Sequence, residues 1–112
     1  MRESSLVRRI IAAIEREYSE SWVRKLADAH TRGLPDLLVI LPGAFVFFIE
    51  VKRPGGRKRA LQEHNAELVE NLQVPWLFVT SMKEALEAIK GIKFERKEDN
   101  HGPKMRVVRR ES

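Results

Sequence analysis

A chain of 112 residues, 43% of them hydrophobic, is long enough to form one small domain with its own core. Lys and Arg number 21 against 16 Asp and Glu, and this net charge of +5 favours a polyanionic partner. The absence of cysteine excludes a disulfide framework and a thiolate zinc site, and the apolar runs are too short to span a membrane. We therefore expect an intracellular, cytoplasmic protein without a membrane partner.

The first predicted element is an amphipathic helix that begins at Ser4 or Ser5 and ends near Tyr18. Serine is a favoured N-cap residue. Apolar residues at helical spacing form one stripe: Leu6, Val7, Ile10, Ile11 and Ile14. Glu3 projects near the middle of this stripe and Glu15 lies on its flank. An acid on an apolar face needs a partner such as a metal ion, but the helix dipole alone also favours a first-turn acid. Periodicity leaves both interpretations of Glu3 open.

A short strand is predicted over Trp22–Asp28, where apolar and polar residues alternate loosely. The loop that follows contains His30 and Arg32. These two residues either contact phosphate or are ordinary surface residues.

Two apolar runs, Leu37–Leu41 and Phe45–Val51, are separated by Pro-Gly-Ala at residues 42–44. Short apolar runs bounded by proline and glycine predict two buried strands joined by a hairpin turn. Asp36 directly precedes the first run and Glu50 lies near the end of the second. Pairing of the strands is expected to bring these two carboxylates together at one end of the sheet.

The residues that converge there suit metal chemistry on a phosphate. Side chains alternate across a strand, so Glu50 and Lys52 share a face. Neighbouring carboxylates such as Glu50 and Asp36 repel unless a cation lies between them, and their oxygens suit Mg²⁺ or Mn²⁺. Such a metal activates water and stabilises charge at phosphorus, while the lysine can orient that water. The structural alternative is a turn at Pro35-Asp36 and a solvated strand edge at Glu50-Val51-Lys52.

A basic, glycine-containing loop follows at residues 53–59. Its cations either contact a nucleic-acid backbone or only make the loop soluble: Arg53, Arg57, Lys58 and Arg59. A helix is predicted over Ala60–Leu72, with Leu61, His64 or Asn65, Leu68 and Leu72 on one side. Gln62 lies in its first turn and faces back toward the strand ends, where its amide can bind water or phosphate.

The last predicted elements are a third apolar strand over Val74–Thr80, parallel to a neighbour, and a short helix. Ser81 caps this helix, which runs over Met82–Lys90 and is closed by Gly91. The segment 92–112 is highly charged. Its residues 93–97 and 105–110 either form a hairpin or remain loose, and its second basic cluster is Arg106, Arg109 and Arg110.

This order of elements and motifs resembles the VRR-NUC domain, the virus-type replication–repair branch of the PD-(D/E)xK nucleases. The resemblance covers about Glu3 to Ile89 and lies in three motifs: Arg32-Gly33-x-Pro35-Asp36, Phe48-Ile49-Glu50-Val51-Lys52-x-Pro54-Gly55 and Gln62. It implies a restriction-endonuclease-like α/β core in the order α-β-β-β-α-β-α, with a mixed central sheet flanked by helices. Residues 1–91 would form the nuclease domain, and residues 92–112 a basic C-terminal extension.

The resemblance also implies residue roles. Asp36 and Glu50 would be ligands of Mg²⁺ or Mn²⁺, with the backbone carbonyl of Val51 completing the shell. Lys52 would act on the nucleophilic water and Gln62 would support the site. The first-helix acid of the family matches Glu3 better than Glu15, so Glu3 would bind metal or water from the helix side.

Similar stand-alone members, found in phages and bacteria, act as homodimers that cut branched DNA such as Holliday junctions. The resemblance therefore implies a DNA endonuclease in a bacterial or phage-infected cell. Its expected DNA contacts are Arg32, Arg53, Arg57, Lys58 and Arg59. Two alternatives stay open at this stage: the same chemistry on linear DNA or RNA, and a non-catalytic DNA-binding module on a nuclease fold.

Overall fold

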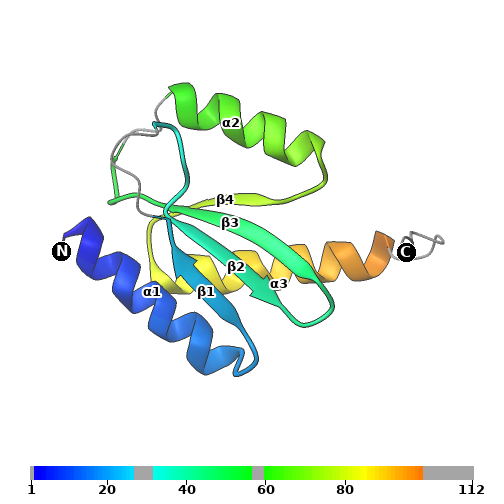
Figure 1. Cartoon of the computed structure of the whole chain (residues 1–112). Helices are drawn as coiled ribbons and strands as arrows, with labels where there is room; N and C mark the ends of the chain where they lie inside the picture. Colours follow the sequence, from blue (N-terminus) through cyan, green and yellow to red (C-terminus); the bar gives the residue numbers. More distant parts are fainter. Residues whose placement is uncertain (1, 27–31, 57–59, 100–112) are drawn as a thin grey trace.

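The computed structural model describes residues 2–26, 32–56 and 60–99 (Figure 1). The helices are α1 (Glu3–Glu17), α2 (Ala60–Asn71) and α3 (Met82–Asp99). The strands are β1 (Trp22–Lys25), β2 (Leu37–Leu41), β3 (Phe45–Val51) and β4 (Trp76–Val79). This is the order α-β-β-β-α-β-α that the sequence predicts, so the expected α/β fold is confirmed. None of the described helices is both long and apolar enough to cross a membrane.

The strands form one mixed sheet in the order β1-β2-β3-β4. β2 pairs antiparallel with both β1 and β3, and β3 pairs in parallel with β4. The predicted hairpin has the predicted bounds, with Leu41 opposite Phe45. Its turn passes through two residues in the left-handed region, Gly43 at φ 86° and Ala44 at φ 58°. The parallel pair requires a crossover, which α2 supplies.

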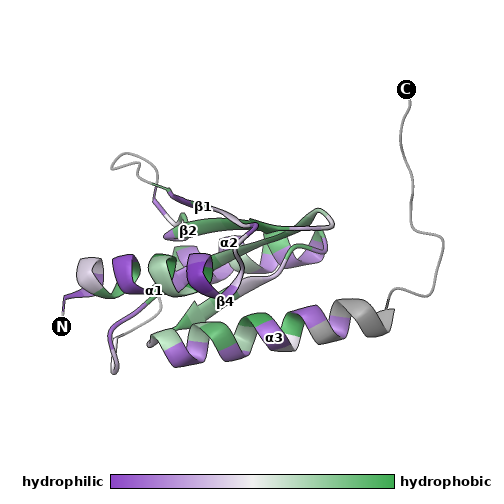
Figure 2. Ribbon diagram, turned by 90° about the horizontal axis from the view of Figure 1, so that it is seen from below, coloured by the Kyte–Doolittle hydropathy of each residue, from purple (hydrophilic) through white to green (hydrophobic). Residues whose placement is uncertain are grey.

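Helices α1 and α3 cover one face of the sheet and enclose the core (Figures 1 and 2). The side chains of β2 and β3 that point to this face are almost fully buried: Leu37, Val39, Leu41, Phe45, Phe47, Ile49 and Val51. Ile10 and Ile14 of α1 meet them, as do Ala85 and Ile89 of α3. At the far end of the two helices, the Lys93 ammonium of α3 lies 4.8 Å from the ring centroid of Tyr18. The predicted stripe of α1 therefore packs on the core.

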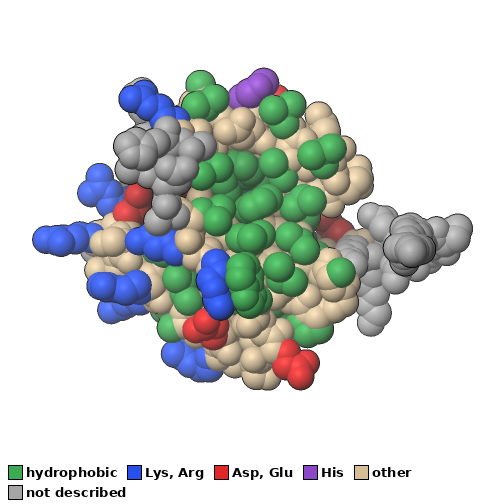
Figure 3. Space-filling model, in the orientation of Figure 1, with side chains coloured by type: hydrophobic (Ala, Val, Ile, Leu, Met, Phe, Trp, Pro, Cys, Tyr) green, Lys and Arg blue, Asp and Glu red, His purple; other side chains and the backbone are tan. Residues whose placement is uncertain are grey.

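The opposite face of the sheet is only partly covered, because α2 packs against β4 at one edge. Apart from Arg24, the alternate side chains of β1 and β2 on this face, and those of β3 before Glu50, are apolar and half-buried or exposed: Trp22, Leu38, Ile40, Val46 and Phe48. We call these residues the open face. Figure 3 views the molecule from this side and shows hydrophobic side chains gathered over the middle of the sheet.

The helix ends differ from the sequence prediction in two places. α1 begins at Glu3 with Arg2 as its N-cap, so the two serines lie in the first turn instead of capping it. α3 does not stop at Gly91 but continues to Asp99, and Ile92 packs against the core. The predicted hairpin strand or loose segment at residues 93–97 is therefore wrong, because these residues belong to α3. Residues 100–112 lie outside the described part of the chain.

The apolar side of α2 is a further correction. Leu61, Leu68 and Leu72 lie on one side of the helix, but they are 46%, 51% and 75% exposed. The residues of α2 that are buried are Gln62 and Ala66. The buried side of α2 thus consists of a polar and a small side chain.

Neighbouring isoleucines of α1 offer a test of this core. Ile10 is fully buried and Ile11 is partly buried at the edge of the cluster. We expect Ile10→Ala to lower the free energy of unfolding by about 2–5 kcal/mol, and Ile11→Ala to lower it clearly less, because the cavity is smaller at a partly exposed site. Urea denaturation followed by circular dichroism measures both. Equal losses would contradict the packing of α1 described here.

Candidate active site

The two predicted carboxylates lie opposite each other at one end of the sheet. Leu37 pairs with Ile49, and one further step of this register places Asp36 opposite Glu50. Residues directly opposite in an antiparallel pair share a face, so both carboxylates lie on the side of the open face. Glu50 is 3% exposed and Asp36 is half-buried. The hairpin therefore brings the pair together as the sequence predicts.

Pro35 limits the strand pairing next to Asp36. A second step of the register places Pro35 opposite Val51, and proline has no N–H to donate to the Val51 carbonyl. The Val51 N–H donates to Oδ2 of Asp36 at 2.7 Å. The main chain of Asp36 is also held, since its carbonyl accepts the Leu26 N–H at 2.8 Å. Asp36 is thereby fixed on both sides, and the Val51 carbonyl is not taken up by residue 35.

Lys52 and Gln62 complete the immediate surroundings of Glu50. The Lys52 Nζ lies 3.2 Å from Oε2 of Glu50, and the Lys52 N–H donates to the Val79 carbonyl of β4 at 2.8 Å. Gln62 is buried and its amide touches Glu50. Among the described residues, Oε1 of Glu50 and Oε1 of Gln62 are buried and accept no hydrogen bond. A buried acceptor oxygen without a donor can be satisfied by a cation, and a nearby positive charge stabilises a carboxylate.

Helix α2 holds the segment before Asp36 through two amide side chains. Gln62 Nε2 donates to the Leu34 carbonyl at 3.3 Å, and Asn65 Nδ2 donates to the Gly33 carbonyl at 2.9 Å. The sequence predicts that Gln62 faces the strand ends, and the structure places it there. The sequence pattern does not distinguish Asn65 from His64 as the residue on this side of α2. The spacing of three residues between Gln62 and Asn65 is the signal that favours Asn65, because residues three apart share a helix face.

The electrostatics favour protonated carboxyl groups unless a cation is present. Burial is the main cause that raises the pKa of Asp36 above its usual range, and the charge of Glu3 adds to it. Burial and the charge of Asp36 raise the pKa of Glu50. The Val51 N–H and Lys52 act in the opposite direction on Asp36, and Gln62 and Lys52 do so on Glu50, but they do not outweigh burial. An added positive charge would reverse this balance.

The structure separates the two candidate first-helix acids. Glu3 is exposed, but its charge reaches Asp36 and raises the pKa of that carboxyl. Glu15 is exposed and lies further along α1, about 18 Å away at the rise of an α-helix. Lys25 was missed in the sequence: it lies at the end of β1 and lowers the pKa of Asp36. The loose alternation of Trp22–Asp28 gave no signal for it.

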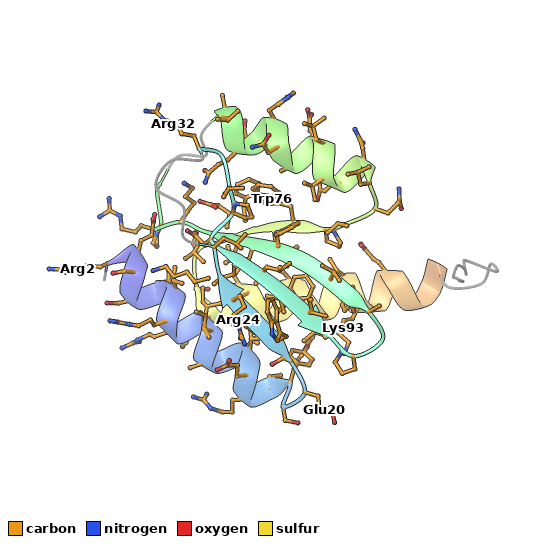
Figure 4. All side chains as sticks on the ribbon, in the orientation of Figure 1. Arg2, Glu20, Arg24, Arg32, Trp76 and Lys93 are labelled. Carbon is orange, nitrogen blue, oxygen red and sulfur yellow. The ribbon has the colours of Figure 1, made fainter. Side chains whose placement is uncertain are left out.

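Two of the predicted DNA-contacting residues, Arg32 and Arg53, lie in the part of the chain that the structure describes. Arg32 and Arg53 are exposed beside the site, and Arg32 extends outward near the start of α2 (Figure 4). Arg57, Lys58, Arg59 and His30 lie outside the described residues.

The donor atoms fit a small oxygen-seeking cation. Within the described ranges no group of three or more His, Cys, Asp or Glu side chains is placed to hold a metal. The available donors are instead Asp36, Glu50 and the Val51 carbonyl. Mg²⁺ is commonly held by one or two carboxylates with several waters, so this set suits Mg²⁺ or Mn²⁺ and not zinc or iron.

A mixed sheet in this order, with Asp and Glu-x-Lys at the end of its central hairpin, has the architecture of a PD-(D/E)xK nuclease. No family model and no curated protein match the chain. A solved structure described as a VRR_NUC domain is similar to it, with 28% sequence identity and a TM-score of 0.62. The match covers 73% of this chain and 91% of that one. Fold and match together support a VRR-NUC domain, a nuclease domain of the PD-(D/E)xK type.

The raised pKa values make a prediction for the metal-free protein. Groups whose pKa is higher in the folded state stabilise it below their unfolded pKa and lose this contribution as the pH rises through the folded pKa. We expect Asp36→Asn, which removes one charge of the pair, to raise the melting temperature relative to wild type. This difference should grow from about pH 4 to pH 7, the range above ordinary carboxyl pKa values.

Differential scanning fluorimetry across this pH range, with and without Mn²⁺, measures the effect. Addition of Mn²⁺ should stabilise wild type and leave Asp36→Asn nearly unchanged. Glu15→Gln is the matched control, because Glu15 is an exposed acid away from the site. A difference that is constant with pH would show that the two carboxyl groups do not oppose each other in the folded state.

Proposed function

We propose that this VRR-NUC domain is a divalent-metal-dependent DNA endonuclease that hydrolyses phosphodiesters in branched DNA such as Holliday junctions. The observation that carries the metal-dependent chemistry is the buried pair Asp36–Glu50 beside Lys52, with Oε1 of Glu50 unpartnered. Burial and mutual repulsion make the charged forms of Asp36 and Glu50 unfavourable, and a non-catalytic DNA-binding module would gain nothing from such a pair. The cost of such a pair is offset only when a cation is bound.

In this proposal Asp36, Glu50 and the Val51 carbonyl hold Mg²⁺ or Mn²⁺, and Glu3 binds metal or water from the side of α1. A divalent cation bound there supplies a Lewis acid that favours hydroxide at neutral pH and neutralises phosphate charge. Burial of Glu50 keeps bulk water from competing for its oxygens. The pair is already in place, so little reorganisation accompanies the reaction.

Lys52 orients the attacking water and offsets the charge that develops on the phosphate. It is suited to this role because its side chain is 13% exposed and is held at Glu50 by the ion pair. Its main chain is fixed to β4, which leaves only the side chain free to follow the substrate. Gln62 supports Glu50 and, through the Leu34 carbonyl, the segment before Asp36.

DNA is proposed to approach the end of the sheet where Arg32 and Arg53 are exposed. Their guanidinium groups suit phosphate oxygens, and the net charge of +5 favours a polyanion overall. Arg57, Lys58 and Arg59 extend this basic segment in the sequence. Phosphate contacts of this kind position the backbone without reading its sequence, which fits an enzyme that recognises the shape of DNA.

A second copy of the chain is proposed to dock on the open face. The face is apolar in its middle, and at its edge Arg24 lies over the Trp22 ring at 4.4 Å. Glu20 lies in the connection between α1 and β1, at one end of the molecule (Figure 4). A two-fold contact between identical surfaces can bury the apolar side chains and pair the basic and acidic groups at the rim. The carboxylate pair lies at one end of the same face, so such a dimer presents two sites, as paired cuts in a junction require.

The catalytic proposal is tested with Lys52→Ala. We expect this variant to cut a labelled four-way DNA junction at least about 100-fold more slowly than wild type in Mg²⁺ or Mn²⁺, because it loses a group that acts only on the reacting atoms. Junction binding should persist, as measured by gel shift in Ca²⁺. Lys90→Ala is the matched control, an exposed lysine of α3.

Matched linear duplex, single-stranded DNA and RNA substrates distinguish the remaining possibilities. Paired nicks in the junction alone support the branched-DNA proposal. Cutting of linear duplex or RNA at the same rate keeps the site but discards junction specificity. Tight binding by wild type without cleavage in either metal would favour the DNA-binding module instead.

The dimer is tested separately with Trp22→Glu, a charge placed on the open face. We expect wild type to have the mass of two chains and Trp22→Glu that of one, because the new carboxylate would be buried without a partner. Size-exclusion chromatography with light scattering measures this. Leu72→Glu on α2, where Leu72 is 75% exposed, should stay dimeric. A monomeric wild type would reject the interface.

A further inference from the structure

The turn before Asp36 is built directly against α2. Gly33 has φ +81°, in the left-handed region that favours glycine. A Cβ on Gly33 would lie 2.6 Å from Nδ2 of Asn65 and 2.7 Å from Cγ of Leu61. There is therefore no room for a side chain between this turn and the helix. The main chain at residue 33 rests on the first turns of α2.

Asn65 makes the shorter of the two hydrogen bonds that hold this segment. It donates to the Gly33 carbonyl at 2.9 Å, while Gln62 donates to the Leu34 carbonyl at 3.3 Å. Residues three apart on a helix share a face, so the two amides act as a pair. Pro35 then follows with a fixed φ, and it is buried.

The sheet holds the other end of the same segment. Asp36 accepts the Val51 N–H on its carboxylate and the Leu26 N–H on its carbonyl. Residues 33–36 thus bridge α2 and the sheet, with two bonds at each end. Because the bridge lies outside regular secondary structure, its geometry depends on these four bonds. A loose anchor at residue 33 would let Asp36 move relative to Glu50.

We infer that Asn65 is a positioning residue of the metal site: its amide fixes Gly33 and thereby the distance between Asp36 and Glu50. This inference rests on the proposed function, since it concerns the same site. Asn65 itself touches neither metal nor substrate. It acts as the outer partner of a ligand, a position whose loss commonly weakens metal binding 10–100-fold.

The test is Mn²⁺ binding by isothermal titration calorimetry to wild type, Asn65→Leu and Asn71→Leu. Leucine has nearly the shape of asparagine but no donor, so Asn65→Leu removes the hydrogen bond and keeps the contact with Gly33. Asn71→Leu makes the same substitution at an exposed position of α2. We expect Asn65→Leu to bind Mn²⁺ about 10–100-fold more weakly than wild type and Asn71→Leu to bind it equally well.

Two further readouts separate positioning from a general structural role. Metal-free junction binding and the far-UV circular dichroism spectrum should be unchanged in Asn65→Leu, and kcat should fall without a change in KM. If Asn65→Leu does not fold, Asn65→Asp replaces only the donor atom and takes its place. Loss of folding in both variants would overturn the inference and assign Asn65 a purely structural role.

The outcomes also distinguish this inference from the proposed function. If wild type binds no Mn²⁺ or Mg²⁺, the proposed metal site itself is rejected. If wild type binds Mn²⁺ and Asn65→Leu binds it with the same affinity, only the positioning role of Asn65 is rejected. Weaker binding by Asn65→Leu with unchanged folding supports both.

Discussion

The hydrogen bond from the Val51 N–H to the Asp36 carboxylate is the contact on which the site depends. The pairing of β2 with β3 ends at Leu37 and Ile49, and beyond it the Val51 N–H is satisfied by the Asp36 side chain. Pro35, which has no N–H, leaves the Val51 carbonyl without a donor from the facing strand, and the Val51 N–H orients the Asp36 carboxylate. The proximity of Asp36 to Glu50 follows from the same register. The pairing of β2 with β3 therefore also brings the two carboxylates of the candidate site together.

The close approach of Asp36 and Glu50 lowers the stability of the folded protein when both carboxyl groups are charged, and the proposed metal binding requires these charged forms. Burial and mutual repulsion raise the pKa values of Asp36 and Glu50, so the folded metal-free protein is stabilised when they are protonated. Lys52 and Gln62 reduce the cost without removing it. A cation that binds only the folded chain would recover this free energy by mass action. This balance supports the proposed metal-dependent chemistry, in which a bound cation would offset the cost of the two carboxylates.

Much of the fold could be predicted because its signals are local. The hairpin strands have the predicted bounds, since each apolar run is closed by proline, glycine or a charged residue. Helix ends were less well predicted. Ser4 and Ser5 do not cap α1, and Gly91 does not end α3, because packing of Ile92 and the contact of Lys93 with Tyr18 continue that helix past the glycine. Tertiary packing overrides a local propensity of about 1 kcal/mol.

The sequence by itself determined the place of the candidate site, because Asp36, Glu50 and Lys52 at strand spacing, with Gln62 early in the next helix, lie at one end of one sheet. Periodicity places these side chains because a strand alternates every second residue. Only the tertiary structure decided which further residues lie around these side chains. The proximity of Glu3 and Lys25 to Asp36, the hold of Asn65 on Gly33 and the open face all depend on how helices lie against the sheet. Contacts between distant segments are set by packing, which no local pattern encodes.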